Sequence, residues 1–372
     1  MNFDMGESKD VQVEIMDQET EQLTTSPPPP TQKNYKWWLQ IMIYIFFLLT
    51  GQTSATILGR LYFDKGGNSK WMATFVQTSG FPLILLFYFL HNPTSENTQP
   101  NPPSNLSLLF IYTVFGIFLA ANSFLYSLGL LYLPVSTYTL ISASQLGFNA
   151  FFSFFLNSQK FTPFIINSVV LLTISSTLLM FQTDSTESQE IPKGKYVIGF
   201  ICTLSASAGY GLMLSMTQFC FIKVFKDESF KVVLDMIFYP SIPATLAVVV
   251  GLFASGEWKG LKREMEVFEL GNVAYLMTLI WIAICWQVFN IGCVGLIFQV
   301  SSLFSNVIST LGLPIVPVLA VFVFHDKMDG LKVISMLLAI WGFVSYAYQH
   351  YLDDYYNSKS DVDEMIPHTL PE

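Results

Sequence analysis

The sequence predicts an all-α polytopic membrane protein, in which ten transmembrane helices form two inverted five-helix repeats. Apolar residues make up 52% of its 372 positions, and charged residues make up only 12%, about half the share found in soluble domains. Residues 97–159 and 270–325 contain no Asp, Glu, Lys or Arg. The negative charge belongs to the two ends, because residues 37–349 hold 14 acidic and 14 basic side chains. These three observations exclude a water-soluble fold and a basic nucleic-acid-binding surface.

The membrane spans follow from the length of the apolar runs. A helix needs about 20 mostly apolar residues to cross a hydrocarbon core of roughly 30 Å. Charges, Pro, Gly and Asn interrupt the runs and leave ten segments: 37–58, 71–90, 106–130, 135–156, 163–181, 196–218, 234–254, 274–297, 300–323 and 331–349. The eighth and ninth segments belong to one uncharged run that is too long for a single span. We expect a tight turn near Gly292, Gly295 and Gln299 to divide it.

The two halves of the chain resemble each other at an offset of 167 residues. At this offset Ile141–Ala143 aligns with Ile308–Thr310, and Lys160 aligns with Lys327. Two repeats with an odd number of helices must insert in opposite orientations, the plan of many secondary transporters, with substrate bound near the midplane. The expected organisation is an acidic disordered tail (1–36), the first repeat (37–181), a connecting loop (182–195), the second repeat (196–350) and an acidic disordered tail (351–372).

Ten spans place both termini on the same side of the membrane. We expect that side to be the cytoplasm, because a long acidic leader without a signal sequence is easier to retain than to translocate. The distribution of Lys and Arg opposes this orientation, since seven would lie inside and ten outside. The expected location is the plasma membrane, with an internal membrane as the alternative.

The interior of the predicted spans is almost free of charge. No Lys, Arg or His lies at an interior position of a span, and the only acid is Asp235, at the edge of the seventh. A carrier of phosphates or nucleotide sugars needs buried cations, and an exporter of cationic drugs needs a buried carboxylate. We therefore expect a neutral, planar substrate that forms hydrogen bonds.

Uncharged polar side chains recur at helical spacing in several spans. Amides can pair with the donors and acceptors at a purine edge, and an aromatic ring can stack on its face. Each residue has a structural alternative, which is interhelical hydrogen bonding for Asn and Gln and core packing for Trp. The predicted substrate-binding residues are Gln77, Gln145, Asn149, Trp286, Gln287, Asn290, Gln299 and Asn306.

Five stretches of the sequence resemble the purine permease family of plants. They are Leu61–Trp71, Tyr132–Gln145, Phe148–Pro163, Phe253–Trp258 and Val300–Pro314. The resemblance implies the ten-helix fold of the drug/metabolite transporter superfamily. It also implies uptake of adenine, cytokinins and related nitrogen heterocycles, often coupled to protons.

The sequence departs from the family at one position that bears on proton coupling. Glu is common in the family where this chain has Gln299, so a carboxylate role is not carried over to that position. Proton symport requires a group that titrates during the cycle, and the candidates at helix ends are Asp235, Asp326 and Glu96, unless the substrate carries its own proton. We expect transport that is either facilitated or coupled through Asp235.

Two other function classes compete with transport. An intramembrane enzyme would need paired Asp residues, a His with an acid, or a Cys/His site at membrane depth, and the spans contain none of these. A non-transporting scaffold or receptor is the remaining alternative.

The spacing of the four cysteines matches no zinc or redox motif, so we expect no metal and no cofactor. The expected partners are a small purine-like molecule and the lipid bilayer, without nucleic acid. The oligomeric state is not predicted.

Overall fold

The computed structural model describes residues 31–90, 104–158, 162–180, 193–225, 230–312, 315–324 and 330–364, and all regular structure in these ranges is helical. The chain divides into two compact units, residues 1–42 and residues 43–372. In the first unit, Trp37 and Trp38 pack edge to face with their ring centroids 5.1 Å apart. The helices described below belong to the second unit, except for the first twelve residues of α2.

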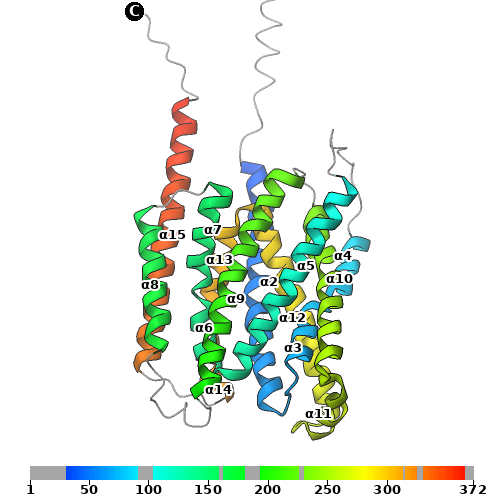
Figure 1. The fold of residues 1–372 in the computed structure, drawn as a ribbon. Coiled ribbons are helices and arrows are strands. Elements are labelled where there is room, and N and C mark those ends of the chain that lie inside the picture. The colour runs from blue at the N-terminus through cyan, green and yellow to red at the C-terminus, as the bar shows by residue number, and fades with distance from the viewer. Residues whose placement is uncertain are drawn as a thin grey trace, which may run out of the picture. The chain divides into compact units, whose positions relative to one another are not determined.

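The helices follow one another in the order drawn in Figure 1. They are α2 (Thr31–Asp64), α3 (Lys70–Thr78), the 3-10 turn η1 (Phe81–Leu83), α4 (Ile84–Leu90), α5 (Asn105–Tyr132), α6 (Val135–Ser142), α7 (Gln145–Asn157), α8 (Pro163–Met180), α9 (Lys193–Phe219), the π-helical turn η3 (Cys220–Phe225), α10 (Phe230–Ser255), the 3-10 turn η4 (Glu257–Gly260), α11 (Leu261–Val267), α12 (Asn272–Gln299), α13 (Ser302–Gly312), α14 (Ile315–Phe324) and α15 (Gly330–Glu364).

Six helical segments of the described chain are long and apolar enough to cross a membrane. They are Tyr35–Asp64, Asn105–Tyr132, Val135–Asn157, Lys193–Phe225, Phe230–Ser255 and Asn272–Gln299. The described chain is therefore all-helical, with several segments able to span a bilayer. The division expected in the long uncharged run is present at Gln299, because α12 ends there and α13 begins at Ser302. The turn expected at Gly292 and Gly295 is wrong, since α12 continues through both glycines.

Two of the predicted spans are interrupted within the described residues. The second is divided into α3 and α4 at Gly80 and Pro82, since proline lacks the amide hydrogen that a continuous helix needs. The fourth is divided into α6 and α7 around Ala143 and Ser144, where the Ser144 hydroxyl donates to the carbonyl oxygen of Ile141 (2.7 Å). The ninth corresponds to α13 and α14, and residues 313–314 between them lie outside the described ranges.

The boundaries predicted for both tails need correction. Helix α2 already begins at Thr31, inside the predicted tail 1–36. Helix α15 continues through residue 350 to Glu364, inside the predicted tail 351–372. No Gly or Pro occurs from residue 343 to residue 366, so the sequence contains no residue that would end this helix at the edge of the apolar run. Residues 1–30 and 365–372 lie outside the described ranges.

Small residues allow helices of the second unit to approach closely. A Cβ atom added at Gly51 of α2 would lie 2.5 Å from the backbone nitrogen of Phe289 in α12. A Cβ atom added at Gly292 of α12 would lie 2.5 Å from the backbone nitrogen of Leu48 in α2. The two helices therefore cross backbone to backbone, the packing that small residues permit between membrane helices.

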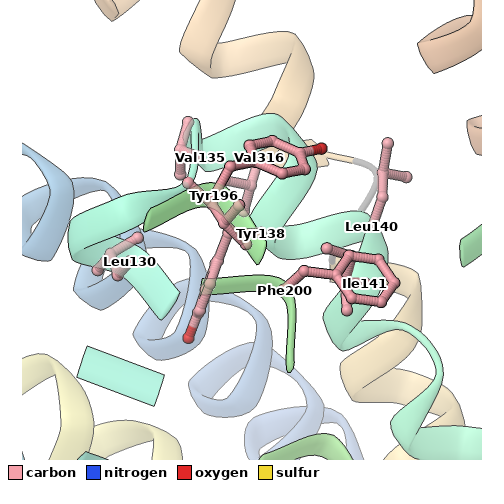
Figure 2. Packing of buried hydrophobic residues seen from close by; sticks show 9 residues of the cluster. Leu130, Val135, Tyr138, Leu140, Ile141, Tyr196, Phe200 and Val316 are labelled. Carbon is pink, nitrogen blue, oxygen red and sulfur yellow. The ribbon is translucent and has the colours of Figure 1, made fainter. Parts of the chain in front are cut away.

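Apolar clusters hold the remaining helices together. One cluster joins α5, α6, α9 and α14, and Figure 2 shows its side chains interdigitating around Tyr138 and Ile141 of α6. The buried members of this cluster are Leu130, Leu133, Val135, Tyr138, Leu140, Ile141, Tyr196, Phe200 and Val316. Another cluster joins α7, α8, α13 and α15, and it includes Leu146, Ile165, Leu303 and Ala339. Helices α6, α7 and α13 are therefore covered on one side and can present polar side chains on the other.

Candidate functional site

A cavity lies among α2, α3, α5, α6, α7, α9, α12 and α13. None of the described residues that line it is charged. The lining residues are Gln52, Thr56, Gln77, Leu119, Asn122, Ser123, Tyr126, Tyr138, Ser142, Gln145, Tyr210, Met213, Trp286, Phe289, Asn290 and Ser309.

A chain of hydrogen bonds forms one wall of the cavity. The Tyr126 hydroxyl donates to Oε1 of Gln145 (3.4 Å), and Nε2 of Gln145 donates to Oγ of Ser309 (3.2 Å). The Ser309 hydroxyl donates in turn to Oε1 of Gln52 (2.9 Å). These bonds connect α5, α7, α13 and α2, and they fix which side of each amide faces the cavity. The Nε2 group of Gln52 stays available as a donor.

The other amide side chains that line the cavity differ in whether they form hydrogen bonds with protein groups. Nε2 of Gln77 donates to Oγ of Ser127 (2.9 Å), so α3 is tied to α5 beside the cavity. Within the described part of the chain, the amides of Asn122 and Asn290 have no hydrogen-bond partner, although both side chains line the cavity. Each offers one acceptor and two donors, which a bound molecule or water can use.

Aromatic side chains supply the remaining surface. Trp286 and Phe289 of α12 pack edge to face with centroids 5.4 Å apart, and Tyr126 and Tyr138 do the same at 5.9 Å. The Tyr210 ring lies 6.4 Å from that of Phe289, and its hydroxyl is 3.2 Å from Sγ of Cys293. The site therefore combines flat apolar faces with amide groups, without a charge.

Of the eight predicted substrate-binding residues, four line this cavity: Gln77, Gln145, Trp286 and Asn290. Two others form hydrogen bonds between helices. Nδ2 of Asn149 donates to the carbonyl oxygen of Ser302 (3.1 Å), and Nδ2 of Asn306 donates to the carbonyl oxygen of Gln145 (3.1 Å). Both side chains are fully buried and do not line the cavity.

The last two predicted binding residues and the proton-coupling candidate also lie outside the lining. Gln287 is buried, and neither polar atom of its side chain has a hydrogen-bond partner in the described structure. Gln299 is the half-buried last residue of α12. Asp235 lies on α10, where its carboxylate accepts a hydrogen bond from the hydroxyl of Tyr88 in α4.

Comparison with known proteins identifies the family. A family model described as purine nucleobase transmembrane transport matches residues 39–355. Probable purine permease 10 of Arabidopsis thaliana is 60% identical over 324 residues, covering 86% of this chain and 83% of the relative. Purine permease 21 of the same plant is 58% identical over 329 residues, covering 88% of this chain and 84% of the relative. The chain belongs to the purine permease family. It is accordingly an integral membrane transporter for purines and not an enzyme.

Several residues that line the cavity of this permease were not among those predicted from sequence. Gln52 lies in the first span as a single amide in an apolar run, without the helical repetition that indicated the other sites. Tyr210 and Phe289 lie in spans already rich in aromatic residues, so nothing in the sequence separates them from core. Asn122 and Tyr126 are more detectable, because they are polar groups one turn apart in an apolar helix.

Proposed function

We propose that this permease carries neutral purine-like bases, namely adenine, cytokinins and related nitrogen heterocycles, through the cavity between its helices. The observation that carries the proposal is a cavity lined by amides and aromatic rings and by no charged residue of the described chain. A charged cargo would be poorly solvated there, because a desolvated ion needs a fixed counter-charge.

The chemistry of a purine matches this lining. The free amides of Asn122 and Asn290 and the Nε2 group of Gln52 offer donors and acceptors to the base edges. The rings of Trp286 and Phe289 offer surfaces for the base face, and stacking contributes about 1–3 kcal/mol per base in proteins that use it. Gln145 contributes through its place in the hydrogen-bonded wall.

The transport cycle we propose is alternating access between two inverted five-helix repeats. Without the short α11, the described helices fall into ten successive segments when α3 is joined with α4, α6 with α7, and α13 with α14. The fourth segment is divided into α6 and α7, the ninth contains Gly312 and Pro314 in sequence, and helices α7 and α13 border the cavity. Interrupted or Gly- and Pro-containing segments at corresponding positions of the two repeats are a feature of binding sites in transporters with inverted repeats.

We further propose a plasma-membrane location with cytoplasmic termini, and transport that is either facilitated or coupled to protons through Asp235. The carboxylate of Asp235 is the group for such coupling because it is the only acid in the predicted spans. Tyr88 of α4 donates a hydrogen bond to this carboxylate on α10. Protonation of Asp235 would weaken the bond and release of the proton would restore it, so the contact between α4 and α10 would follow the protonation state.

Uptake tests the proposal against a scaffold or receptor that does not transport. The assay measures accumulation of radiolabelled adenine and trans-zeatin in yeast that lack their own purine uptake, with surface abundance measured in parallel. We expect accumulation above the empty-vector strain, and inhibition of each substrate by the other. Accumulation equal to empty vector at confirmed surface abundance would reject transport of these bases. Glucose and uracil arms would show whether another small neutral solute is carried instead.

A further inference from the structure

Two sequence segments that are far apart, and that the binding cavity does not use, contact each other at one end of the helices. The first is the connection between α2 and α3, residues 65–69, with Lys70. The second is residues 257–269, which contain η4 and α11 and connect α10 with α12. Two glutamates of the second segment, Glu257 and Glu264, bind the first segment through both backbone and side-chain groups.

Glu264 joins the ends of α2, α3 and α12. Its Oε1 accepts hydrogen bonds from the hydroxyls of Tyr62 and Tyr275, the latter at 3.1 Å. Its Oε2 accepts from the backbone amide of Ser69 (3.1 Å). The Tyr62 side chain is fully buried, and its hydroxyl also lies 3.2 Å from the carbonyl oxygen of Ser69. One carboxylate therefore holds three elements of the chain together.

Glu257 holds the start of α3. Its Oε2 accepts from the hydroxyl of Ser69 (2.7 Å) and from the backbone amide of Trp71 (3.3 Å). Its Oε1 lies 3.6 Å from Nζ of Lys70. Ser69 is also the N-cap of α3, since its hydroxyl accepts from the amide of Met72 (3.0 Å). The N-terminus of α3 is thus fixed by a carboxylate from the other half of the chain.

A second hollow lies between the main cavity and these glutamates. It is smaller than the main cavity and shares Thr56, Gln77, Tyr126, Tyr138 and Trp286 with it. On α2 the main cavity is lined by residues 52 and 56, whereas the second hollow is lined by residues between 55 and 63. On α12 the main cavity is lined by residues between 286 and 290, whereas the second hollow is lined by residues 282 and 286. Both shifts point toward the segments joined by Glu257 and Glu264.

Tyr62 closes the second hollow on the side of the two glutamates. Its ring lines the second hollow, and its hydroxyl is bonded to Glu264. The ring of Phe268, on the segment after α11, is buried in the same apolar cluster as Tyr62 and Tyr275. A molecule leaving the main cavity in this direction meets the Tyr62 ring and then the two glutamates.

We propose that Tyr62, Ser69, Glu257 and Glu264 form a gate that closes this end of the transport path and opens during the cycle by releasing the two glutamates. The proposal rests on the alternating access proposed above, because a gate has a role only if the site opens to both sides in turn.

The polar contacts of Glu257 and Glu264 favour opening at this end of the helices rather than at the crossing of α2 and α12. Carboxylates and hydroxyls that separate can be hydrated by water entering from the adjacent end of the helices, so the open form leaves few groups unsatisfied. The crossing of α2 and α12 at Gly51 and Gly292 is different, because there the backbones meet directly and a separation would leave an apolar void. At the edge of the contact, Nζ of Lys65 donates to Oε2 of Glu269 (2.8 Å), and this bond raises the pKa of the Lys65 ammonium.

Thiol accessibility tests the gate without requiring transport. Ala73 lines the second hollow and is 7% exposed, so Ala73→Cys serves as the reporter in a chain whose four native cysteines are replaced by serine. A membrane-impermeant thiol reagent is applied to intact cells and, separately, to inside-out vesicles. The gate variants are Glu264→Ala and Tyr62→Phe. The matched control is Glu266→Ala, an exposed glutamate on the same short helix.

We expect both gate variants to label about ten-fold faster than the parent from one membrane face only, because each loses a hydrogen bond to a charged group that holds the closed form. The Glu266→Ala control is expected to label at the parent rate. Unchanged labelling in gate variants of normal abundance, or equal acceleration from both faces, would overturn the gate.

A cross-link between the two segments tests the gate even if the gate variants do not fold. The side-chain oxygens of Ser69 and Glu257 are 2.7 Å apart, and cysteine is shorter than glutamate, so the pair Ser69→Cys and Glu257→Cys is joined with a short bifunctional methanethiosulfonate rather than by a direct disulfide. We expect the cross-linked protein to lose uptake and to regain it with a reductant. Full uptake by the cross-linked protein would overturn the gate. Absence of uptake before cross-linking would instead count against the proposed function, while the labelling rates still test the gate.

Discussion

Replacing Asn149 with leucine is expected to destabilise this permease without changing its affinity for substrate. The Asn149 side chain is fully buried on α7, and Nδ2 donates to the carbonyl oxygen of Ser302 on α13 (3.1 Å). Its Oδ1 accepts from the hydroxyls of Ser215 on α9 (2.7 Å) and Ser153 (3.3 Å). The residue therefore holds three helices together through two interhelical hydrogen bonds, and its bond with Ser153 lies within α7.

The magnitude follows from these bonds. Interhelical hydrogen bonds in a membrane protein contribute on average about 0.6 kcal/mol each, so the loss of the two that reach α9 and α13 amounts to about 1.2 kcal/mol. Leucine has the same branched heavy-atom skeleton as asparagine but a larger volume, so overpacking of this fully buried site adds to the loss of polar contacts. We expect the midpoint of thermal unfolding in detergent to fall by a few degrees, with KM for adenine unchanged in the molecules that remain folded.

The decisive comparison is between stability and KM for the same variant. Unfolding of purified protein is followed by intrinsic tryptophan fluorescence, and KM is measured by uptake normalised to surface abundance. An Asn149→Leu protein with parental stability and a several-fold higher KM would refute the reasoning. That result would return Asn149 to the substrate site, where the spacing of polar residues in the sequence first assigned it.

Three further predictions concern other parts of the structure. Asn290→Leu is expected to keep normal abundance and raise KM several-fold, because a neutral hydrogen bond to the substrate contributes about 1 kcal/mol; an unchanged KM would exclude that contact. Gly116→Ala is expected to reduce folded abundance, because the added Cβ would lie 2.4 Å from the carbonyl oxygen of Pro240, whereas Gly194→Ala meets nothing within 4 Å and should match the parent in a membrane-fraction blot. Asp235→Asn is expected to abolish any protonophore-sensitive part of uptake, and sensitivity that survives the change would remove Asp235 as the proton carrier.

The sequence predicted the helices better than their interruptions. Apolar length and missing charge locate a span because a bilayer demands both, and the division of the long uncharged run was found between α12 and α13. The break near Ala143 was not predicted, because the sequence Ser-Ala-Ser is compatible with a helix interior. The break coincides with a hydrogen bond from the Ser144 hydroxyl to the carbonyl oxygen of Ile141, which the sequence pattern does not indicate. The end of α15 was misplaced because the apolar run stops before the helix does.

The candidate site shows a similar limit. Gln145 and Asn149 lie one turn apart on the same face of α7, so periodicity treats them alike. The cavity lies beside Gln145, whereas the helices that carry Ser215 and Ser302 close over Asn149. Which residue faces open space depends on the helix opposite, and a single span contains no information about that helix.

The close crossing of α2 and α12 explains how two residues without a shared sequence pattern come to line one cavity. Gly51 lets the backbone of α12 approach at Phe289, and Gly292 lets α2 approach in return. Gln52 follows Gly51, and Asn290 follows Phe289, so the contact that brings the two backbones together also brings these two amides to the same cavity. The glycines act here beyond packing, because any larger residue at the crossing would separate the helices and draw the amides apart. A glycine followed by a lone amide in an apolar span is thus a sequence signal that combines close approach with a polar group, and periodicity alone does not detect it.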